Sequence, residues 1–159
     1  MAYNVQLLKA DVLDELDKIN RIVQEFKNTA EKIDLPADEV SNYDRGAIGY
    51  LLHNFYNGCE SIFRSIARFF ENDLDSTSWH KDLLKRMKIK IPGYRPQVIN
   101  NELYTLLDDF RAFRHKFRYT YAFELDWERE QLVARKLLPA RKMLKDQIET
   151  FLNQLDELD

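Results

Sequence analysis

The chain has 159 residues, 45% of them hydrophobic, and a formal net charge of -3, a balance typical of one globular domain over residues 1–159. Its single cysteine excludes an intramolecular disulfide, and no apolar run approaches the roughly 18 residues that a membrane-spanning helix needs. The N-terminus shows no apolar signal segment, so we expect a cytoplasmic protein that does not contact a membrane.

The first two expected helices follow from apolar residues that recur in steps of three and four. One such series extends over residues 5–33, and Pro36 ends it because proline disfavours helical geometry at the residue before it. A second series begins within residues 38–44 and continues to about Phe70. Three glycines inside this second helix should allow another helix to approach closely: Gly46, Gly49 and Gly58.

A short helix is expected between two loops. Residues 72–78 form a polar segment that should be a loop and offers caps for a helix from Trp79 to about Lys88. Residues 91–96 contain two prolines and a glycine, which predict the second loop.

Two further helices complete the expected fold, one from about Gln97 to about Tyr121 and one from near Asp126 to about Leu155. Pro139 should either kink the last helix or mark a late start. No segment of useful length alternates apolar and polar residues with period two. We therefore predict an all-α, mostly up-and-down bundle of four long helices and one short helix.

The most informative segment is residues 111–118, here called the basic strip. It places five basic or potentially basic side chains on a chain that is slightly acidic overall. On a continuous helix Arg111, Arg114 and Arg118 fall within about 60° of one another, and His115 and Tyr121 extend this arc on its two sides. Bulky apolar side chains on the adjoining face should be core: Leu106, Phe110, Phe113 and Phe117.

The basic strip has two interpretations. Arginine forks bind phosphate in bidentate fashion, and nearby aromatic rings stack on unpaired bases, which favours RNA or a nucleotide as the ligand. Alternatively, the three arginines pair with acidic neighbours, as surface residues commonly do. Composition alone does not separate the two interpretations, and the acidic candidates are Asp108, Asp109, Glu124 and Asp126.

Residues 114–121, with the sequence RHKFRYTY, resemble the Arg-x4-His-x-Tyr signature of HEPN-domain ribonucleases, specifically the HepT-like toxins. The flanking segments 110–113 and 122–126 agree with the same family, and so do residues 52–60 and 79–84. The resemblance covers essentially the whole chain. The helical bundle that it implies matches the one predicted from periodicity.

The resemblance implies an endoribonuclease that needs no metal or other cofactor and works as a homodimer with a shared cleft for RNA, such as tRNA. It also implies a partner, a nucleotidyltransferase antitoxin that transfers AMP to the signature tyrosine and blocks the site. On this sequence the AMPylated residue is Tyr121 and the catalytic arginine is Arg114. RNA is expected to contact Arg111, His115 and Arg118.

The chain departs from the signature at Tyr119, which occupies the position of the catalytic histidine. In the family this histidine serves the attack of the ribose 2′-OH on the neighbouring phosphate, a role that suits imidazole, with its ordinary pKa of about 6.5. A phenol is a poor base at pH 7, although it can donate a hydrogen bond. His115 is not an obvious substitute, because it lies about 100° around the helix from Arg114.

Two functions therefore stay open. The chain is either a nuclease in which Arg114 and Tyr119 form the catalytic pair, or an interaction module that binds RNA or its protein partner without cleavage.

Other polar residues lie outside the basic strip. His53 and His80 are far from it in sequence, and no spacing typical of metal ligands appears, so we expect no metal site. On the second helix Asn54, Asn57 and Glu60 are expected to satisfy a helix crossing rather than to act in the cleft.

Overall fold

The computed structural model describes residues 2–71 and 79–157 as α-helices joined by short connections and two 3-10 helices. In chain order the elements are α1 (Ala2–Lys27), α2 (Ala30–Ile33), η1 (Ala37–Glu39), α3 (Asn42–Phe70), α4 (Trp79–Met87), α5 (Asn101–Phe117), η2 (Ala122–Glu124), α6 (Trp127–Ala134) and α7 (Leu137–Glu157). No β-strand occurs in these residues, so the expected all-α fold is confirmed. The loop expected over residues 72–78 lies outside the described residues.

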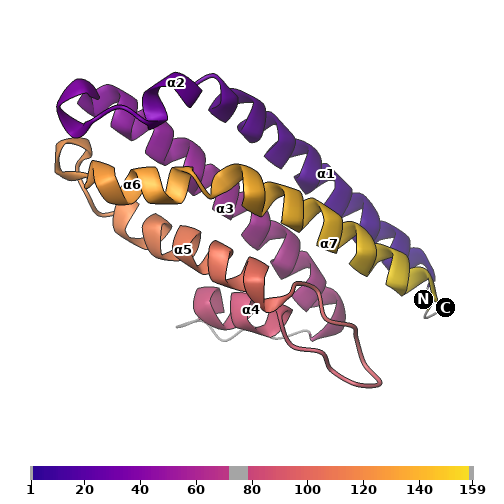
Figure 1. Cartoon of the computed structure of the whole chain (residues 1–159). Helices are drawn as coiled ribbons and strands as arrows, with labels where there is room; N and C mark the ends of the chain where they lie inside the picture. Colours follow the sequence, from indigo (N-terminus) through magenta and orange to yellow (C-terminus); the bar gives the residue numbers. More distant parts are fainter. Residues whose placement is uncertain (1, 72–78, 158–159) are drawn as a thin grey trace.

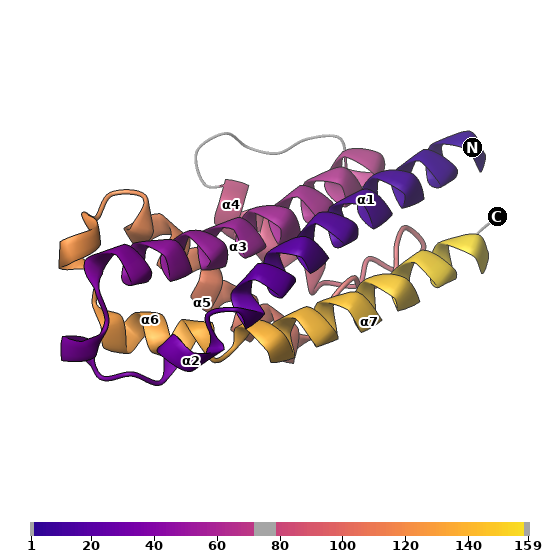
Figure 2. The same ribbon diagram turned by 90° about the horizontal axis from the view of Figure 1, so that it is seen from above.

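The long helices run along one axis of an elongated bundle (Figure 1). α1 packs along α3, and α7 runs beside α1, so that the start of α1 and the end of α7 lie next to each other (Figures 1 and 2). α5 packs on α3, while α2 and α6 lie toward the opposite end of the bundle. None of the helices within the described residues has both the length and the apolar character to cross a membrane.

α1 and α3 approach closely because a glycine of α3 faces α1. A Cβ atom on Gly58 would lie only 2.6 Å from Cγ1 of Ile19, so a larger residue would push the two helices apart. Ile19 belongs to the stripe of α1 that is buried in this interface. The expectation that a glycine of the second helix permits close approach is confirmed at this position.

The first helix is interrupted after Lys27, which corrects the continuous helix expected over residues 5–33. The Thr29 hydroxyl donates to the carbonyl of Phe26 at 2.7 Å, and the Thr29 amide donates to the same oxygen at 2.9 Å. These bonds span three residues instead of four, and they tighten the chain into a turn. α3 then begins within its expected window, after Ser41, whose hydroxyl accepts an amide N–H of the first turn.

α5 begins at Asn101, later than the predicted start near Gln97. The amides of Val98 and Ile99 both donate to the carbonyl of Met87, at 3.0 and 3.1 Å. These two residues therefore close the end of α4 instead of opening α5. The asparagine that precedes α5 caps it with its side-chain oxygen.

The predicted last helix is two helices, α6 and α7, with a break at Arg135 and Lys136. In a continuous helix the ring of Pro139 would collide with the carbonyl of Arg135, four residues earlier. Pro139 instead lies in the first turn of α7, where its missing N–H leaves no helical bond unmade. Of the two expected effects of Pro139, the late start is the one that the structure shows.

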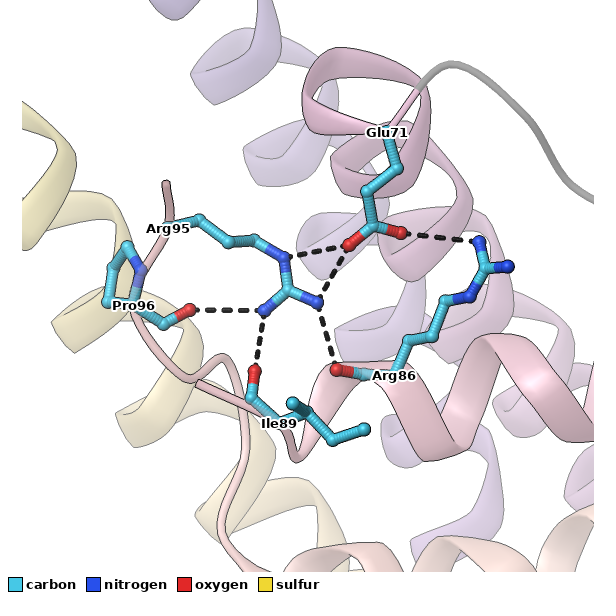
Figure 3. A network of polar contacts seen from close by, with 5 residues as sticks. All are labelled: Glu71, Arg86, Ile89, Arg95 and Pro96. Atoms are coloured by element: carbon cyan, nitrogen blue, oxygen red, sulfur yellow. Dashed lines mark hydrogen bonds and ion pairs between the residues drawn. The ribbon is translucent and has the colours of Figure 1, made fainter. Parts of the chain in front are cut away.

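The loop before α5 is anchored by the buried side chain of Arg95 (Figure 3). Its guanidinium donates to the Glu71 carboxylate at 3.0 and 2.8 Å, and to the main-chain carbonyls of Arg86, Ile89 and Pro96. A buried arginine is tolerated when its charge is paired and its donors are met in this way. The network ties the end of α3 to the loop, and it thereby fixes where α5 starts relative to α3.

Candidate functional site

α5 carries the basic strip only as far as Phe117. Beyond this residue the Thr120 hydroxyl and the Tyr119 amide both donate to the carbonyl of Lys116, at 2.7 and 3.1 Å, and the chain turns out of the helix. The prediction that the helix reaches Tyr121 is therefore wrong. Tyr121 does not continue the arginine face of α5 but follows the turn, immediately before η2.

Arg111 is neutralised within α5. Its Nε lies 2.7 Å from Oδ1 of Asp108, one helical turn earlier. The interpretation that acidic neighbours pair with the basic strip is thus confirmed for this arginine. Two other acidic candidates have different partners: Asp109 lies 2.6 Å from Nζ of Lys136, and Asp126 caps α6.

Arg114 is held between α5 and α3 by a buried carboxylate. Its Nη1 lies 3.8 Å from Oε2 of Glu60, and the two side chains are 15% and 5% exposed. The same carboxylate oxygen lies 2.8 Å from Nδ1 of His80 on α4. Glu60 therefore links side chains of three helices at one point and supplies the countercharge of the expected catalytic arginine.

Arg118 has different surroundings, because it is exposed and forms no ion pair with the described residues. Its guanidinium carbon lies 5.9 Å from the ring centre of Tyr119. His115 is also exposed, with its ring 5.8 Å from the same tyrosine. The C-terminal end of the basic strip is thus positively charged and open to solvent.

Four exposed aromatic side chains, here called the aromatic surface, accompany this end of the strip: Tyr50, Tyr119, Tyr121 and Phe123. Tyr50 comes from α3, which packs against η2, and the other three come from the chain that follows α5. The rings of Tyr121 and Phe123 are stacked, with centres 5.4 Å apart and planes within 4°. Exposed flat rings, one of them next to the guanidinium of Arg118, form a surface on which planar ligands stack readily.

His53 lies beside the basic strip despite its distance from it in sequence. Its ring centre is 5.7 Å from that of Phe117, the last residue of α5. Burial lowers the pKa of His53, and the positive charges of Arg114 and Arg118 lower it further, while Glu60 acts in the opposite direction. The imidazole is therefore neutral at pH 7.

A second carboxyl group is buried where α5 and α6 pack on α3. A Cβ atom on Gly49 would lie 2.7 Å from the ring of Phe117 and 3.3 Å from Oε1 of Glu130. Glu130 is fully buried, and neither of its oxygens has a hydrogen-bond partner within residues 2–71 and 79–157. Burial raises the pKa of Glu130 to about 8, although the nearby charge of Arg45 opposes the shift, so this carboxyl is neutral at pH 7.

The sequence did not assign His53 or Glu60 to the site. Glu60 was expected to satisfy a helix crossing; the structure shows that it does so by holding Arg114. The two residues are seven positions apart on α3 and share one helix face, and this spacing of polar groups was the available signal. The described residues contain no cluster of three or more acidic, histidine or cysteine side chains that could hold a metal ion.

A comparison with known proteins bears on the whole arrangement. A family model described as HepT-like protein matches residues 47–155, which include most of α3, the basic strip and nearly all of α7. No curated protein and no solved structure matches the chain significantly.

Proposed function

Because this chain belongs to the HepT-like protein family, we propose that it is the toxin of a toxin–antitoxin pair and cleaves RNA without a metal ion. The observation that carries the proposal is the pairing of Arg114 with buried Glu60, next to a strip end that is positively charged and open. A guanidinium fixed in advance binds a phosphate without first losing side-chain freedom.

The charged side chains and the aromatic rings of the site are suited to different parts of the RNA. Arg118 and His115 are exposed and suit contacts with the phosphate backbone, while the aromatic surface suits stacking with unpaired bases. Arg111 contributes less, because it must leave Asp108 before it meets a phosphate.

We expect the chain to act as a homodimer in which the ends of two α5 helices form one RNA cleft. Light scattering at micromolar concentration tests this state.

The second part of the proposal is the antitoxin, a nucleotidyltransferase that adds AMP to Tyr121. This side chain is 68% exposed, so its hydroxyl is accessible to a partner enzyme. An added AMP would place a phosphate and a purine on the aromatic surface, where RNA is expected to bind. The modification would thus compete directly with the substrate.

A different class of function, a non-catalytic interaction module, is favoured by one observation. Tyr119 stands where the signature has its histidine, and it is 75% exposed. An exposed phenol is a poor proton-transfer group at pH 7. In this reading the site binds RNA or the antitoxin and performs no chemistry.

Cleavage of RNA by the purified chain in EDTA decides between the two functions. Wild-type protein is incubated with tRNA and with an unstructured RNA between pH 6 and 9, and the products are resolved on a denaturing gel. We expect cuts that Arg114→Ala abolishes. A wild-type chain that binds these RNAs but leaves them intact at every pH would favour the interaction module.

A further inference from the structure

The signature of this chain lacks its histidine, and the structure offers another imidazole. We propose that His53 on α3 is the catalytic proton acceptor of the site. The inference rests on the proposed RNA-cleaving function and names a residue for the step that Tyr119 performs poorly.

The first argument is geometric. The ring of His53 packs against two aromatic rings, with its centre 6.3 Å from that of Tyr50 and 5.7 Å from that of Phe117. It is half-buried, and its Nδ1 is buried without a hydrogen-bond partner in the described part of the chain. Buried polar atoms are rarely left unpaired in a purely structural residue. Because Nδ1 is buried, we assign the contact with the ligand to Nε2.

The second argument is electrostatic, and it concerns every charge that faces the ring. Arg114 on α5 and Arg118 just beyond it act on His53 from one neighbouring element, and Glu60 acts from α3 itself. Burial first, and then the charges of the two arginines, lower the pKa of His53, so that the imidazole is neutral and its lone pair is available at pH 7. The two arginines that help to keep His53 unprotonated are therefore also the groups that suit the scissile phosphate.

The third argument is a comparison of His53 with the two other histidines of the chain. His115 is exposed and its ring packs edge-on against Tyr119, while His80 is engaged by the Glu60 carboxylate at 2.8 Å. His53 combines a lowered pKa, a buried nitrogen without a hydrogen-bond partner within the described residues, and an electrostatic interaction with Arg114.

The step balances as a transesterification. Nε2 of His53 takes the proton of the ribose 2′-OH, and the freed electron pair of O2′ forms a bond to phosphorus. The P–O5′ bond breaks with its electron pair on O5′, which takes a proton from water, and the hydroxide so formed recovers the proton from His53. The products are a 2′,3′-cyclic phosphate and a 5′-hydroxyl end, and the enzyme returns to its starting state. The guanidinium of Arg114 stabilises the charge that grows on the phosphate oxygens.

The test measures RNA cleavage and RNA binding separately in His53→Ala and His53→Gln, with Asn54→Ala as the matched control. Asn54 is the next residue of α3 and is also half-buried, so its truncation perturbs the helix to a similar degree. We expect each His53 variant to lower the cleavage rate by at least ~100-fold, within the range that a positioned base contributes. RNA affinity should change by less than about threefold, because the arginines remain, and Asn54→Ala should cut normally.

Chemical rescue separates a catalytic His53 from a structural one. Added imidazole should restore part of the activity of His53→Ala, since it fits the space left by the ring, and should not help His53→Gln. The rate of the wild type should also rise with pH as His53 deprotonates, and this limb should vanish in His53→Gln.

The outcomes distinguish this inference from the proposed function. If the wild type cuts RNA and both His53 variants cut equally fast, His53 is not the base, and the nuclease function stands. If both variants fold, lose activity and gain nothing from imidazole, His53 acts only on the structure of the site, and the inference is overturned. If the wild type binds RNA without cutting it, the nuclease function and the role of His53 both fail.

Discussion

Glu60 on α3 and Arg114 on α5 face each other inside the bundle, with 3.8 Å between Oε2 and Nη1. Both side chains are largely withdrawn from water, and the Nε of Arg114 has no hydrogen-bond partner within the described residues. The same carboxylate oxygen lies 2.8 Å from Nδ1 of His80 on α4. One buried charge thus organises the arginine of the signature, and the stability of the bundle and the geometry of the site depend on the same residue.

Removal of Glu60 should therefore cost stability as well as function. Glu60→Ala leaves the guanidinium of Arg114 without its countercharge, and breaking a buried pair in this way typically costs about 3–5 kcal/mol. Arg114 is not fully buried, so we expect the free energy of unfolding to fall by roughly 2–4 kcal/mol in urea titrations.

Asp108→Ala is the matched control for Glu60→Ala, because it removes the carboxylate that pairs with Arg111 on the surface of α5. Pairs of this kind contribute less than about 1 kcal/mol. Equal losses of unfolding free energy in the two variants would contradict the prediction that the buried carboxylate contributes more than the surface one.

RNA binding should depend on Arg114 and not on positive charge in general. Arg114→Ala removes a guanidinium that is fixed inside the site, whereas Arg68→Ala removes an exposed one on α3, outside the basic strip. We expect Arg114→Ala to weaken RNA binding by at least ~10-fold and Arg68→Ala by less than about twofold, measured by fluorescence anisotropy at several salt concentrations. The slope of affinity against salt reports the few phosphates in contact. Similar losses for both variants would mean that the bound charge is diffuse.

Periodicity predicted the helices well, because each long helix buries one apolar stripe and the steps of three and four are local. The ends were predicted poorly, because they depend on bonds that a periodic pattern does not contain. The Thr29 hydroxyl ends α1, and the carbonyl of Met87 delays α5 by accepting two amides from the following loop. The Thr29 bond is local but is not part of the apolar pattern, and the partner of Val98 and Ile99 is set by the packing of α4.

Only part of the candidate site could be predicted from the sequence, for a similar reason. Arg114 and Arg118 lie within one short segment, so their spacing marked them. His53 and Glu60 come from α3, some sixty residues earlier, and the ring of Phe117 approaches α3 at Gly49, where a Cβ atom would lie 2.7 Å from it. That contact is a product of tertiary packing, and no local pattern contains it.

The neutral carboxyl of Glu130 should make stability depend on pH. Its pKa is about 8 in the folded chain, against 4.5 in the unfolded chain, so between these values the folded state binds the extra proton. Stability from this group is fully present below about pH 4.5, and it is lost as pH rises toward 8, by up to about 1.4 kcal/mol per pH unit. Unfolding in urea at several pH values between 5 and 9 measures this loss.

Glu130→Gln should flatten the pH dependence of stability, because glutamine is neutral throughout, and should make the protein more stable than the wild type at pH 9. Glu128→Gln serves as the control, since Glu128 lies on the same short helix but is exposed. A wild-type curve that is no steeper than that of Glu130→Gln would show that the Glu130 carboxyl is ionised in the fold.

AMP transfer by a cognate nucleotidyltransferase should occur at Tyr121. The residue follows the turn that ends α5, and its exposed ring stacks on Phe123, which leaves the hydroxyl accessible. Intact mass spectrometry with the partner and ATP should show additions of AMP that disappear in Tyr121→Phe. Persistence of the full mass shift in this variant would place the acceptor elsewhere, with Tyr119 as the next residue to replace.

Restoring the histidine of the signature should accelerate cleavage. Tyr119→His places an imidazole, with an ordinary pKa of about 6.5, beside Arg118, where it could protonate the leaving O5′ in place of water. We expect the rate to rise at least ~10-fold, toward the low end of what a positioned acid or base contributes, while RNA affinity changes little because Arg114 and Arg118 remain. Tyr119→Phe is the control, and it should leave the rate unchanged if the phenol takes no part. In the His53→Ala background, Tyr119→His should recover only part of the lost activity, since the acceptor for the 2′-OH proton would still be missing. Full recovery in this double variant would show that a histidine at position 119 performs the whole proton transfer. His53 would then be needed only while position 119 is a tyrosine.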